Sequence, residues 1–336
     1  MKSFTCAVIG LGAIHMNHVR AIQALPDCRL AAVCDIDEEK VQADVQMLGC
    51  AGYTDYRTML EQEDIDVVHI CTPHYLHAPM AIYALEHGCH VLVEKPMGMN
   101  SVETAAMIQA AERSGKQLGI CFQNRYNPTV RRIRDLIDQG VLGRFLSSKT
   151  IVSWNRDASY YAQGAWRGTW AQEGGGVLIN QAIHTMDLTQ WLAGMPIDVQ
   201  AQTSCFRLQG AIEVEDTAHG YFHYADGASG VFYLTNAFGA DDPVELDLVF
   251  ENATLRLKKD LSIQYVDGSE EHMDDQSLVS GAKGYWGNGH ATLIRDYYAC
   301  LDENRPFPID GPEAAKIIKI LDAIYRSAAT GNRISI

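Results

Sequence analysis

The chain has 336 residues, of which 47% are hydrophobic and 21% are charged, and its formal net charge is −15. This composition is typical of a globular protein that is long enough for two domains, each with its own core. The sequence has no basic stripe of the kind that binds nucleic acid, and no run approaches the roughly 18 apolar residues of a membrane helix.

Short apolar runs alternate with helix-like segments in the first third of the chain. The runs are rich in β-branched residues, which predicts buried parallel strands. Repeated strand–helix units predict an α/β domain with a doubly wound parallel sheet. The predicted strands are residues 4–9, 30–35, 67–71, 90–94 and 117–122, and the predicted helices are residues 14–25, 37–48, 78–86 and 101–114.

After about residue 140 the pattern changes to glycine-rich turns between longer alternating strands. The pairs Asp226-Gly227 and Asp267-Gly268 are typical of hairpin turns. We therefore expect one domain over residues 1–122 and a second, α+β domain over residues 123–336 with a broad antiparallel sheet. An amphipathic helix over residues 313–328 closes the chain and can pack back on the first domain. The predicted strands are residues 145–154, 199–208, 217–224, 229–235, 244–250 and 261–266.

A glycine-rich turn joins the first predicted strand to the first predicted helix. Glycine lets the backbone approach a pyrophosphate, which then rests on the helix N-terminus, so the turn indicates a dinucleotide site. The third position of the fingerprint is His15, where Gly or Ala is usual. The residues of this turn predicted to contact the cofactor are Gly10, Gly12, Ala13 and Ile14.

Asp35 supports the dinucleotide assignment because it ends the next predicted strand. An acidic residue at this place can accept hydrogen bonds from both ribose hydroxyls of the adenosine half. It would also repel a 2′-phosphate, and no arginine follows at residues 36–38. The sequence therefore predicts NAD rather than NADP. A tight turn followed by a solvated acid is the alternative interpretation.

Lys95 follows a buried strand and precedes Pro96. An X-Pro bond can be cis, and the carboxyl ends of parallel strands are where such sheets bind ligands. An amine at this edge can hydrogen-bond the alkoxide that develops on a substrate hydroxyl. We therefore predict that Lys95 is catalytic, and a surface lysine is the alternative.

The triplet at residues 174–176 precedes a segment that carries Asn180, His184 and Asp187. If this segment is helical, spacings of four and three residues place the three side chains on one side. Imidazole titrates near neutral pH, so His184 is the predicted general base, with Asp187 orienting it or stabilising the imidazolium. A lone helical histidine is more often a core residue, but the combination with Lys95 favours catalysis.

Other clusters carry weaker predictions. His74, His77, His87 and His90 flank two turns, but no cysteine or carboxylate completes a zinc set at the usual spacing, so no metal is predicted. Nine cysteines without a CxxC pair favour reduced core thiols in a cytoplasmic protein. Aromatic residues that can stack on sugar rings or pack in a core are Trp154, Tyr160, Tyr161, Trp166, Trp170, Tyr285 and Trp286.

These motifs resemble the glucose–fructose oxidoreductase / inositol dehydrogenase / rhizopine catabolism (Gfo/Idh/MocA) family over nearly the whole chain. The most specific parts are Glu94-Lys95-Pro96 and the block from Gly174 to Asp187. The resemblance implies a Rossmann domain followed by a domain with an open-faced sheet, which often packs face to face in homodimers or homotetramers. The other matching segments are residues 10–12, 35, 72–77, 123–128 and 166–168.

The family pattern also assigns roles to residues. Lys95 and His184 would be catalytic. Inositol dehydrogenase-like members have Asp where this chain has Asn180, and an amide cannot favour a protonated histidine by charge. The predicted relay therefore uses His184 with Lys95, and an inositol substrate is less favoured. The residues expected along the cofactor are Thr72, Pro73, His77, Glu94, Lys95 and Asn124, and those expected at the substrate are Lys95, Tyr126, Trp166, Asn180 and His184.

The sequence thus predicts an NAD-dependent dehydrogenase that oxidises or reduces a secondary alcohol on a sugar, sugar derivative or cyclitol. Two alternatives stay open. One is a non-catalytic protein of the same fold that senses a sugar or nucleotide, although such relatives tend to lose the lysine or the histidine. The other is an enzyme that retains NAD through an internal redox cycle.

Overall fold

The computed structural model describes residues 2–275 and 289–336, so Tyr285 and Trp286 lie outside the described residues. The chain divides into two compact units. Unit 1 comprises Met1–Gln123 and His290–Ala315, and unit 2 comprises Asn124–Gly289 and Lys316–Ile336. Each unit is described by itself below.

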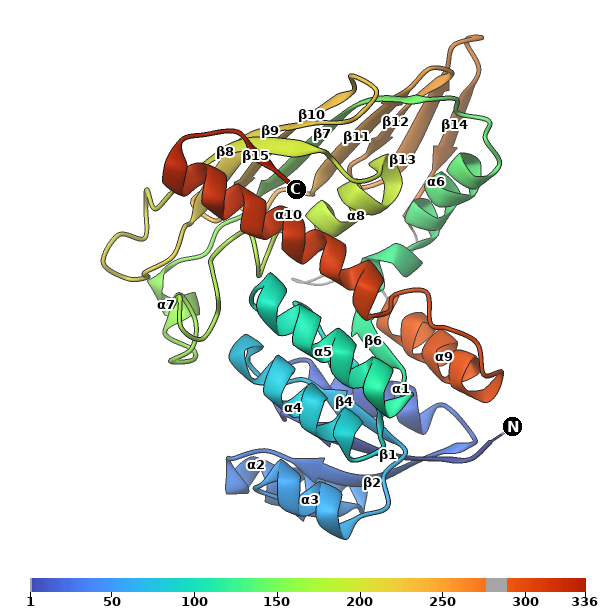
Figure 1. Cartoon of the computed structure of the whole chain (residues 1–336), viewed down its shortest axis with the longest axis vertical. Coiled ribbons are helices and arrows are strands. Elements are labelled where there is room, and N and C mark those ends of the chain that lie inside the picture. The colour runs from blue at the N-terminus through green and yellow to red at the C-terminus, as the bar shows by residue number, and fades with distance from the viewer. Residues whose placement is uncertain (1, 276–288) are drawn as a thin grey trace. The chain divides into compact units, whose positions relative to one another are not determined.

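Unit 1 is built on sheet A, which has six strands in the described part of the chain, in the order β3-β2-β1-β4-β5-β6 (Figure 1). All neighbouring strands pair in parallel. Every residue of β4 and β6 is buried, as expected for a sheet covered on both faces. The doubly wound parallel fold is therefore confirmed. The strands are β1 Phe4–Ile9, β2 Cys28–Cys34, β3 Ala51–Tyr53, β4 Val67–Ile70, β5 His90–Glu94 and β6 Leu118–Cys121.

Most of the predicted helices of unit 1 begin and end close to the predicted residues. Asp37 caps α2, accepting hydrogen bonds from the backbone N–H groups of Glu39 and Lys40. Asn100 caps α5, accepting hydrogen bonds from the backbone N–H groups of Val102 and Glu103. The helices are α1 His15–Gln23, α2 Glu38–Leu48, α3 Tyr56–Gln62, α4 His74–Glu86, α5 Ser101–Ser114 and α9 Gly289–Asp302.

The segment at residues 290–315 joins unit 1, whereas the sequence suggested a continuous second domain from residue 123. Two buried tyrosines of α9 account for the difference. The Tyr297 hydroxyl lies 2.9 Å from the carbonyl oxygen of Val91 in β5, and the Tyr298 hydroxyl lies 2.9 Å from Nε2 of His69 in β4. These contacts join residues about 200 apart in the chain, which no local pattern indicates.

Unit 2 is built on sheet B, with nine strands among the described residues, in the order β14-β13-β12-β11-β7-β10-β9-β8-β15 (Figure 1). Only the β7–β10 pair is parallel among these described strands, so the mostly antiparallel sheet is confirmed. Gly227 and Gly268 occupy the predicted hairpin turns with φ of 79° and 87°. The strands are β7 Phe145–Ser153, β8 Asp198–Ser204, β9 Thr217–His223, β10 Ser229–Thr235, β11 Glu245–Phe250, β12 Ala253–Leu257, β13 Leu261–Tyr265, β14 Glu270–Met273 and β15 Ile334–Ser335.

Helices cover one face of sheet B. Val130 and Ile133 of α6 and Leu188 of α8 share a buried core with apolar residues of β11, β12 and β13. The residues that alternate with this core along the strands point to the other face, where Val231 and Tyr233 are exposed. The helices are α6 Pro128–Asp138, α7 Ala158–Tyr161, α8 Ile183–Ala193 and α10 Gly311–Thr330, preceded by the 3₁₀ helix η1 Gln123–Tyr126.

The last helix begins in unit 1, but residues 316 onward belong to unit 2. The Ser327 hydroxyl accepts a hydrogen bond of 3.0 Å from the backbone N–H of Ala201 in β8. This part of α10 therefore packs within unit 2, whereas the sequence suggested packing on the first domain. None of the described helices is long and apolar enough to span a lipid bilayer.

Candidate active site

The glycine turn after β1 has the geometry that a dinucleotide needs. Gly10 has φ of 92°, and a Cβ there would lie 2.7 Å from the backbone carbon of Cys71. A Cβ on Gly12 would meet nothing within 4 Å, so the backbone borders open space where α1 begins. Ala13 is exposed and Ile14 is half-buried before the first turn of that helix. This opening beside a helix N-terminus fits a pyrophosphate.

Asp35 is fixed beside that turn. Its Oδ2 atom accepts a 2.7 Å hydrogen bond from the backbone N–H of Leu11, and its Oδ1 atom accepts a 3.0 Å bond from Asp37. Both donors are backbone groups, so the carboxylate has lone pairs left for ribose hydroxyls. Ile36, the next residue, is 89% exposed and offers an apolar surface at the same place.

His15 explains why the fingerprint tolerates a large residue at its third position. One ring nitrogen contacts the carbonyl oxygen of Gly12, and Nε2 lies 3.0 Å from a carboxylate oxygen of Asp44 in α2. The side chain thus turns toward the neighbouring helix. Small residues usually stand here because the helix packs closely on the strand, and the ring avoids that contact.

His77 connects two loops of the predicted cofactor site. Its Nδ1 atom lies 2.7 Å from the carbonyl oxygen of Pro96, and its Nε2 atom lies 2.8 Å from that of Thr72. Burial lowers the pKa of the ring, and the two carbonyls oppose this effect. Since both ring nitrogens face backbone oxygens, His77 fixes the Thr72–Pro73 turn against the loop that follows β5.

Lys95 directly follows β5, and its peptide bond to Pro96 is cis, as the sequence suggested. The lysine side chain is half-buried. Its backbone N–H lies 3.3 Å from Oε2 of Glu94. Lys95 therefore stands at the carboxyl edge of sheet A, the same edge as the glycine turn and Asp35.

Glu94 points into unit 1 and ends a chain of buried polar groups that the sequence did not predict. Burial opposes its ionisation, but hydrogen bonds from His18 and His290 hold its pKa well below the usual range. Both Nε2 atoms lie near Oε1, at 2.9 and 3.1 Å. His18 then contacts His69, and His69 contacts the Tyr298 hydroxyl. Since an ionised carboxylate only accepts, every proton of this chain is directed toward Glu94.

Two groups of three metal-binding side-chain types have their ligand atoms within 4.8 Å of one another in the described residues. The buried group shares the Glu94 carboxylate, whose oxygens already accept hydrogen bonds. We therefore assign no metal to it. The groups are His18, Glu94 and Cys121, and Asp260, His272 and Asp274.

In unit 2, the predicted helix begins later than the sequence suggested. α8 starts at Ile183, so Asn180 lies in the turn before it and does not share its helical face with His184 and Asp187. The glycine triplet is responsible, because residues 174–182 form consecutive turns. His184 is half-buried in the first turn of α8. The Asn180 amide donates a hydrogen bond to Oε1 of Glu173, which is fully buried.

Asp187 is held by Arg125, which was not predicted from the sequence. Nε and Nη2 of Arg125 donate bonds of 2.7 and 2.6 Å to its two carboxylate oxygens, and the two side chains are 2% and 1% exposed. The guanidinium also lies 5.0 Å from the ring centre of Trp191. The predicted role of Asp187 beside His184 stays a prediction, and the structure adds that its charge is balanced by Arg125.

The predicted residues after β6 differ in exposure. Asn124 is half-buried, and its Oδ1 atom is buried without a hydrogen-bond partner among the residues described here. Such an orphaned acceptor is costly unless a ligand or water satisfies it, so it fits a site for a cofactor amide or hydroxyl. Tyr126 is 8% exposed, with the Arg131 guanidinium 4.2 Å from its ring centre. Its ring is therefore mostly packed inside unit 2.

Arginines and aromatic rings surround the loops near α7. The Tyr160 hydroxyl lies 2.7 Å from Nη1 of Arg167 and 3.1 Å from Nε2 of Gln181, which precedes His184 by three residues. The Arg167 guanidinium also lies 4.6 Å from the ring of Trp166, which is half-buried. This cluster can present both a flat aromatic face and several N–H donors to a polyol.

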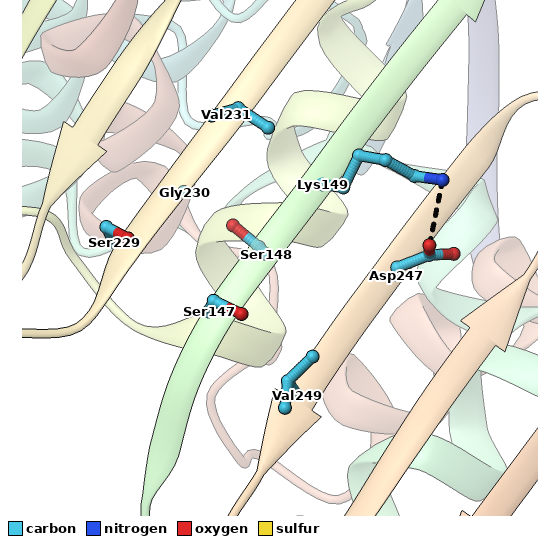
Figure 2. A pocket seen from close by; sticks show the side chains of 8 residues that line it. All are labelled: Ser147, Ser148, Lys149, Ser229, Gly230, Val231, Asp247 and Val249. Carbon is cyan, nitrogen blue, oxygen red and sulfur yellow. Dashed lines mark ion pairs between the residues drawn. The ribbon is translucent and has the colours of Figure 1, made fainter.

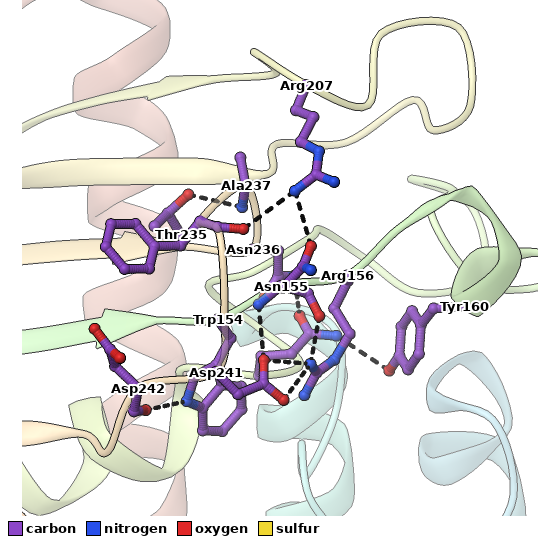
Figure 3. Close-up of polar contacts among 12 residues, drawn as sticks. Trp154, Asn155, Arg156, Tyr160, Arg207, Thr235, Asn236, Ala237, Asp241 and Asp242 are labelled. Carbon is purple, nitrogen blue, oxygen red and sulfur yellow. Dashed lines mark hydrogen bonds and ion pairs between the residues drawn. The ribbon is translucent and has the colours of Figure 1, made fainter.

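A second polar cluster borders this one (Figure 3). Arg156 donates to Asp241 at 2.8 Å, and its guanidinium lies 5.3 Å from the ring of Trp154. Asn155 contacts the same carboxylate through its backbone N–H and accepts a 2.8 Å bond from Arg207. The loops after β7, β8 and β10 are thereby joined by polar side chains.

Comparisons with known proteins agree with this geometry. Residues 4–122 match the family described as "Oxidoreductase family, NAD-binding Rossmann fold" (GFO_IDH_MocA), and residues 130–256 match the GFO/IDH/MocA C-terminal domain. The chain is similar to D-apiose dehydrogenase of Paraburkholderia graminis, with 26% identity covering 100% of this chain and 90% of that protein. It is also similar to D-glucoside 3-dehydrogenase of Escherichia coli, with 29% identity covering 98% of this chain and 97% of that one.

Solved structures show the same fold. The WlbA dehydrogenase of Bordetella pertussis, in complex with NADH and UDP-GlcNAcA, superposes with a TM-score of 0.87 at 29% identity, covering 100% of this chain and 99% of that chain. A levoglucosan dehydrogenase in complex with NADH and levoglucosan superposes with a TM-score of 0.87 at 23% identity, covering 100% of both chains. The second likeness bears on the fold alone.

Proposed function

The chain belongs to the GFO/IDH/MocA oxidoreductase family, and we propose that it oxidises or reduces a secondary alcohol on a sugar, sugar derivative or cyclitol. It is an NAD-binding dehydrogenase, since the family's first domain binds NAD and similar proteins are dehydrogenases. We propose below which class of sugar reacts and which residues act on it.

One observation carries the proposal: Lys95, the Gly10–Gly12 turn and Asp35 occupy one edge of sheet A. They follow β5, β1 and β2, which are parallel and lie close together in the sheet order. Ligands of such sheets bind outside the carboxyl ends of the strands. A dinucleotide held by the turn and Asp35 would thus lie along the edge that carries the lysine amine.

The residues then divide the chemistry. Asp35 would accept the ribose hydroxyls, and the N-terminus of α1 would face the pyrophosphate. When bound, NAD supplies the hydride acceptor. Lys95 would hydrogen-bond the substrate oxygen as its negative charge develops, and His184 would remove the hydroxyl proton. We further propose that Asn124 satisfies its orphaned Oδ1 atom on the cofactor and that Asn180 and Trp166 contact the sugar.

NAD is preferred over NADP for a reason of charge. A 2′-phosphate carries close to two negative charges and would lie beside the Asp35 carboxylate, which two backbone N–H groups hold in place. Residues 36–38 supply no arginine to balance it. We therefore propose tighter binding of NADH than of NADPH.

Relatives that act on apiose and glucosides support a sugar substrate, and a nucleotide-linked sugar bound to a similar structure supports testing those as well. The Asn180 amide, bonded to Glu173, would offer its oxygen to a substrate hydroxyl. A sugar is favoured over an inositol because Asn180 brings no charge to His184.

A substrate panel with two variants tests the proposal. Sugars, sugar acids, nucleotide sugars and inositols would be assayed by NADH absorbance with wild type, Lys95→Ala and His184→Ala. We expect kcat/KM to fall about 100- to 1000-fold in each variant, because each removes a group that acts on the developing charge or the proton. Lys116→Ala and His272→Ala, which remove side chains away from the site, are matched controls and should keep wild-type activity.

The same panel separates the alternatives. If a substrate reacts and both site variants keep full turnover, the assigned roles are wrong. Binding of a sugar and NAD without any absorbance change would favour a sensing protein. Cofactor that co-purifies with the protein and survives dialysis would favour an enzyme that retains NAD through its cycle.

We also propose that the open face of sheet B joins two copies of the chain in a homodimer or homotetramer. A depression of about 320 Å³ lies on this sheet among residues of β7, β10 and β11 (Figure 2). Lys149 and Asp247 form a 2.8 Å ion pair at its edge, and Val231 beside it is 53% exposed. Light scattering after gel filtration tests this: Val231→Glu should reduce the mass toward that of one chain, and an unchanged mass would contradict it.

A further inference from the structure

A buried carboxylate outside the predicted site holds the glycine turn that leads to His184. Glu215 is 4% exposed and lies in the segment between β8 and β9. Its carboxylate oxygens accept hydrogen bonds of 3.0 Å from the backbone N–H of Gly176 and 3.1 Å from that of Leu178. The Tyr325 hydroxyl of α10 donates a further bond of 3.1 Å. Three donors from two distant segments thus converge on one side chain.

The glycines of the turn make this approach possible. A Cβ on Gly176 would lie 1.8 Å from the carbonyl oxygen of Glu215, and a Cβ on Gly175 would lie 2.0 Å from the Tyr325 hydroxyl. Gly175 also has φ of 154°, which side-chain-bearing residues rarely adopt. Glycine is therefore required at positions 175 and 176 by the close approach of Tyr325 and Glu215.

The held turn fixes the start of α8. The backbone N–H of Asn180 donates a 3.1 Å bond to the carbonyl oxygen of Gly176, and that of Ala182 donates a 2.8 Å bond to Val177. Ile183 and His184 follow as the first residues of the helix. A displacement of Gly176 would therefore move Asn180 and the imidazole together.

We propose that Glu215 and Tyr325 are positioning residues that set the place of Asn180 and His184 in unit 2. They act through the backbone of the turn and touch no reacting atom. The proposal rests on the function proposed above for His184. It assigns to Glu215 a role in turnover that does not extend to binding of the dinucleotide, since its contacts lie within unit 2.

Because the charge of Glu215 changes with pH, the tightness with which it holds the turn should also change with pH. Burial raises its pKa to about 7, against the lowering effect of the Leu178 and Gly176 N–H groups. The other titratable groups near it are Tyr325 on α10, Tyr161 on α7 and Glu173, which interact with it or with the same hydroxyls. A neutral acid with its proton on Oε2 would oppose the Gly176 N–H at that oxygen, while Oε1 would still accept from all three donors. The turn is therefore held more tightly above about pH 7.

The free energy of unfolding should change with pH in the opposite direction to the tightness of the turn. Because the folded state raises this pKa above its ordinary value of 4.5, Glu215 contributes stability that is present below about pH 4.5 and lost as the pH rises through 7. Glu215→Gln removes this pH dependence. The effect on stability and the effect on the turn can thus be measured separately.

The steady-state kinetics of Glu215→Gln test whether Glu215 affects turnover. The amide oxygen can still accept at the Oε1 position, but the amide NH2 group would stand at the Oε2 position against the Gly176 N–H. We therefore expect kcat to fall about tenfold while the KM for NAD stays within about twofold. The acid limb of the kcat profile near pH 7 should change shape as well. Glu213→Gln is the matched control, because this exposed carboxylate lies two residues earlier and accepts a surface hydrogen bond from the backbone N–H of Trp170. Wild-type kcat in Glu215→Gln would overturn the proposal.

Hydrogen exchange tests it without any substrate. In Glu215→Gln and in Tyr325→Phe, amides of residues 174–182 should exchange at least about tenfold faster, with protection in β1 and α1 unchanged. Tyr325→Phe keeps the packing of the ring, so it serves if Glu215→Gln does not fold. If no sugar is turned over but exchange rises as expected, the turn is held by Glu215 and only the proposed function fails. Unchanged exchange in both variants would overturn the inference.

Discussion

The predicted site residues of unit 1 and those of unit 2 are held in different ways. In unit 1, Asp35 is fixed by the N–H groups of residues 24 and 2 positions away, and the turn it borders is shaped by its own glycines. In unit 2, the turn before His184 is held by Glu215, 39 residues beyond Gly176, and by Tyr325, 110 residues beyond Glu215. The first set is encoded locally, and the second is assembled from distant parts of the chain.

Substitutions should therefore have different effects in the two units. Backbone donors near in sequence keep the cofactor edge intact when one side chain is lost. Buried charges with distant partners leave an unpaired group inside unit 2 when one member is removed. Substitutions in unit 2 should therefore reduce stability as well as activity, and those in unit 1 should mainly change cofactor binding.

The largest expected effect comes from Arg125→Ala. This variant leaves the Asp187 carboxylate buried without its bidentate partner, so the free energy of unfolding should fall by about 3–5 kcal/mol. Urea unfolding followed by circular dichroism measures it. Arg113→Ala is the control, because its ion pair with Glu86 is exposed and should cost about 0–1 kcal/mol. Equal losses in the two variants would contradict the contrast between buried and local contacts.

A smaller effect is expected from Asp35→Ser, which removes the proposed acceptor of the ribose hydroxyls. The dissociation constant for NADH should rise about 10- to 100-fold, as expected for lost hydrogen bonds to a charged group. The preference for NADH over NADPH should weaken, since the repelling carboxylate is gone. Fluorescence titration with both cofactors measures this. Unchanged NADH affinity would mean that Asp35 does not face the adenosine ribose.

The sequence predicted the parts of the fold that local patterns determine. Five of the six described strands of sheet A and the hairpins at Gly227 and Gly268 agree with the structure, because apolar runs and turn residues specify them directly. The sixth strand, β3 Ala51–Tyr53, was not predicted, since it has only three residues. The position of α9 in unit 1 was missed, since it depends on tyrosine contacts across about 200 residues.

The candidate site shows the same division. Gly10, Gly12, Asp35 and Lys95 lie where their motifs indicated, at one edge of sheet A. The helical spacing of Asn180 was wrong, because three consecutive glycines favour turns over helix. The partners of the predicted residues, such as Arg125 and Glu215, carry no local signal.

The smallest expected effect tests the tolerance of the fingerprint. His15→Ala removes a partly buried contact with Asp44, so the free energy of unfolding should fall by less than about 1 kcal/mol. NADH affinity should stay within about twofold of wild type, since the ring points toward α2. A large loss of affinity would show that His15 contacts the cofactor and would revise the geometry of the turn.

We propose that Lys95 and His184 would act on the same substrate hydroxyl beside one bound nicotinamide. A crystal structure with NADH and a sugar identified by the panel measures this directly. We expect Lys95 Nζ and one His184 ring nitrogen each to lie within about 3.5 Å of a single sugar oxygen. A complex in which the two side chains face different ligands, or in which either lies beyond reach of the reacting carbon, would contradict it.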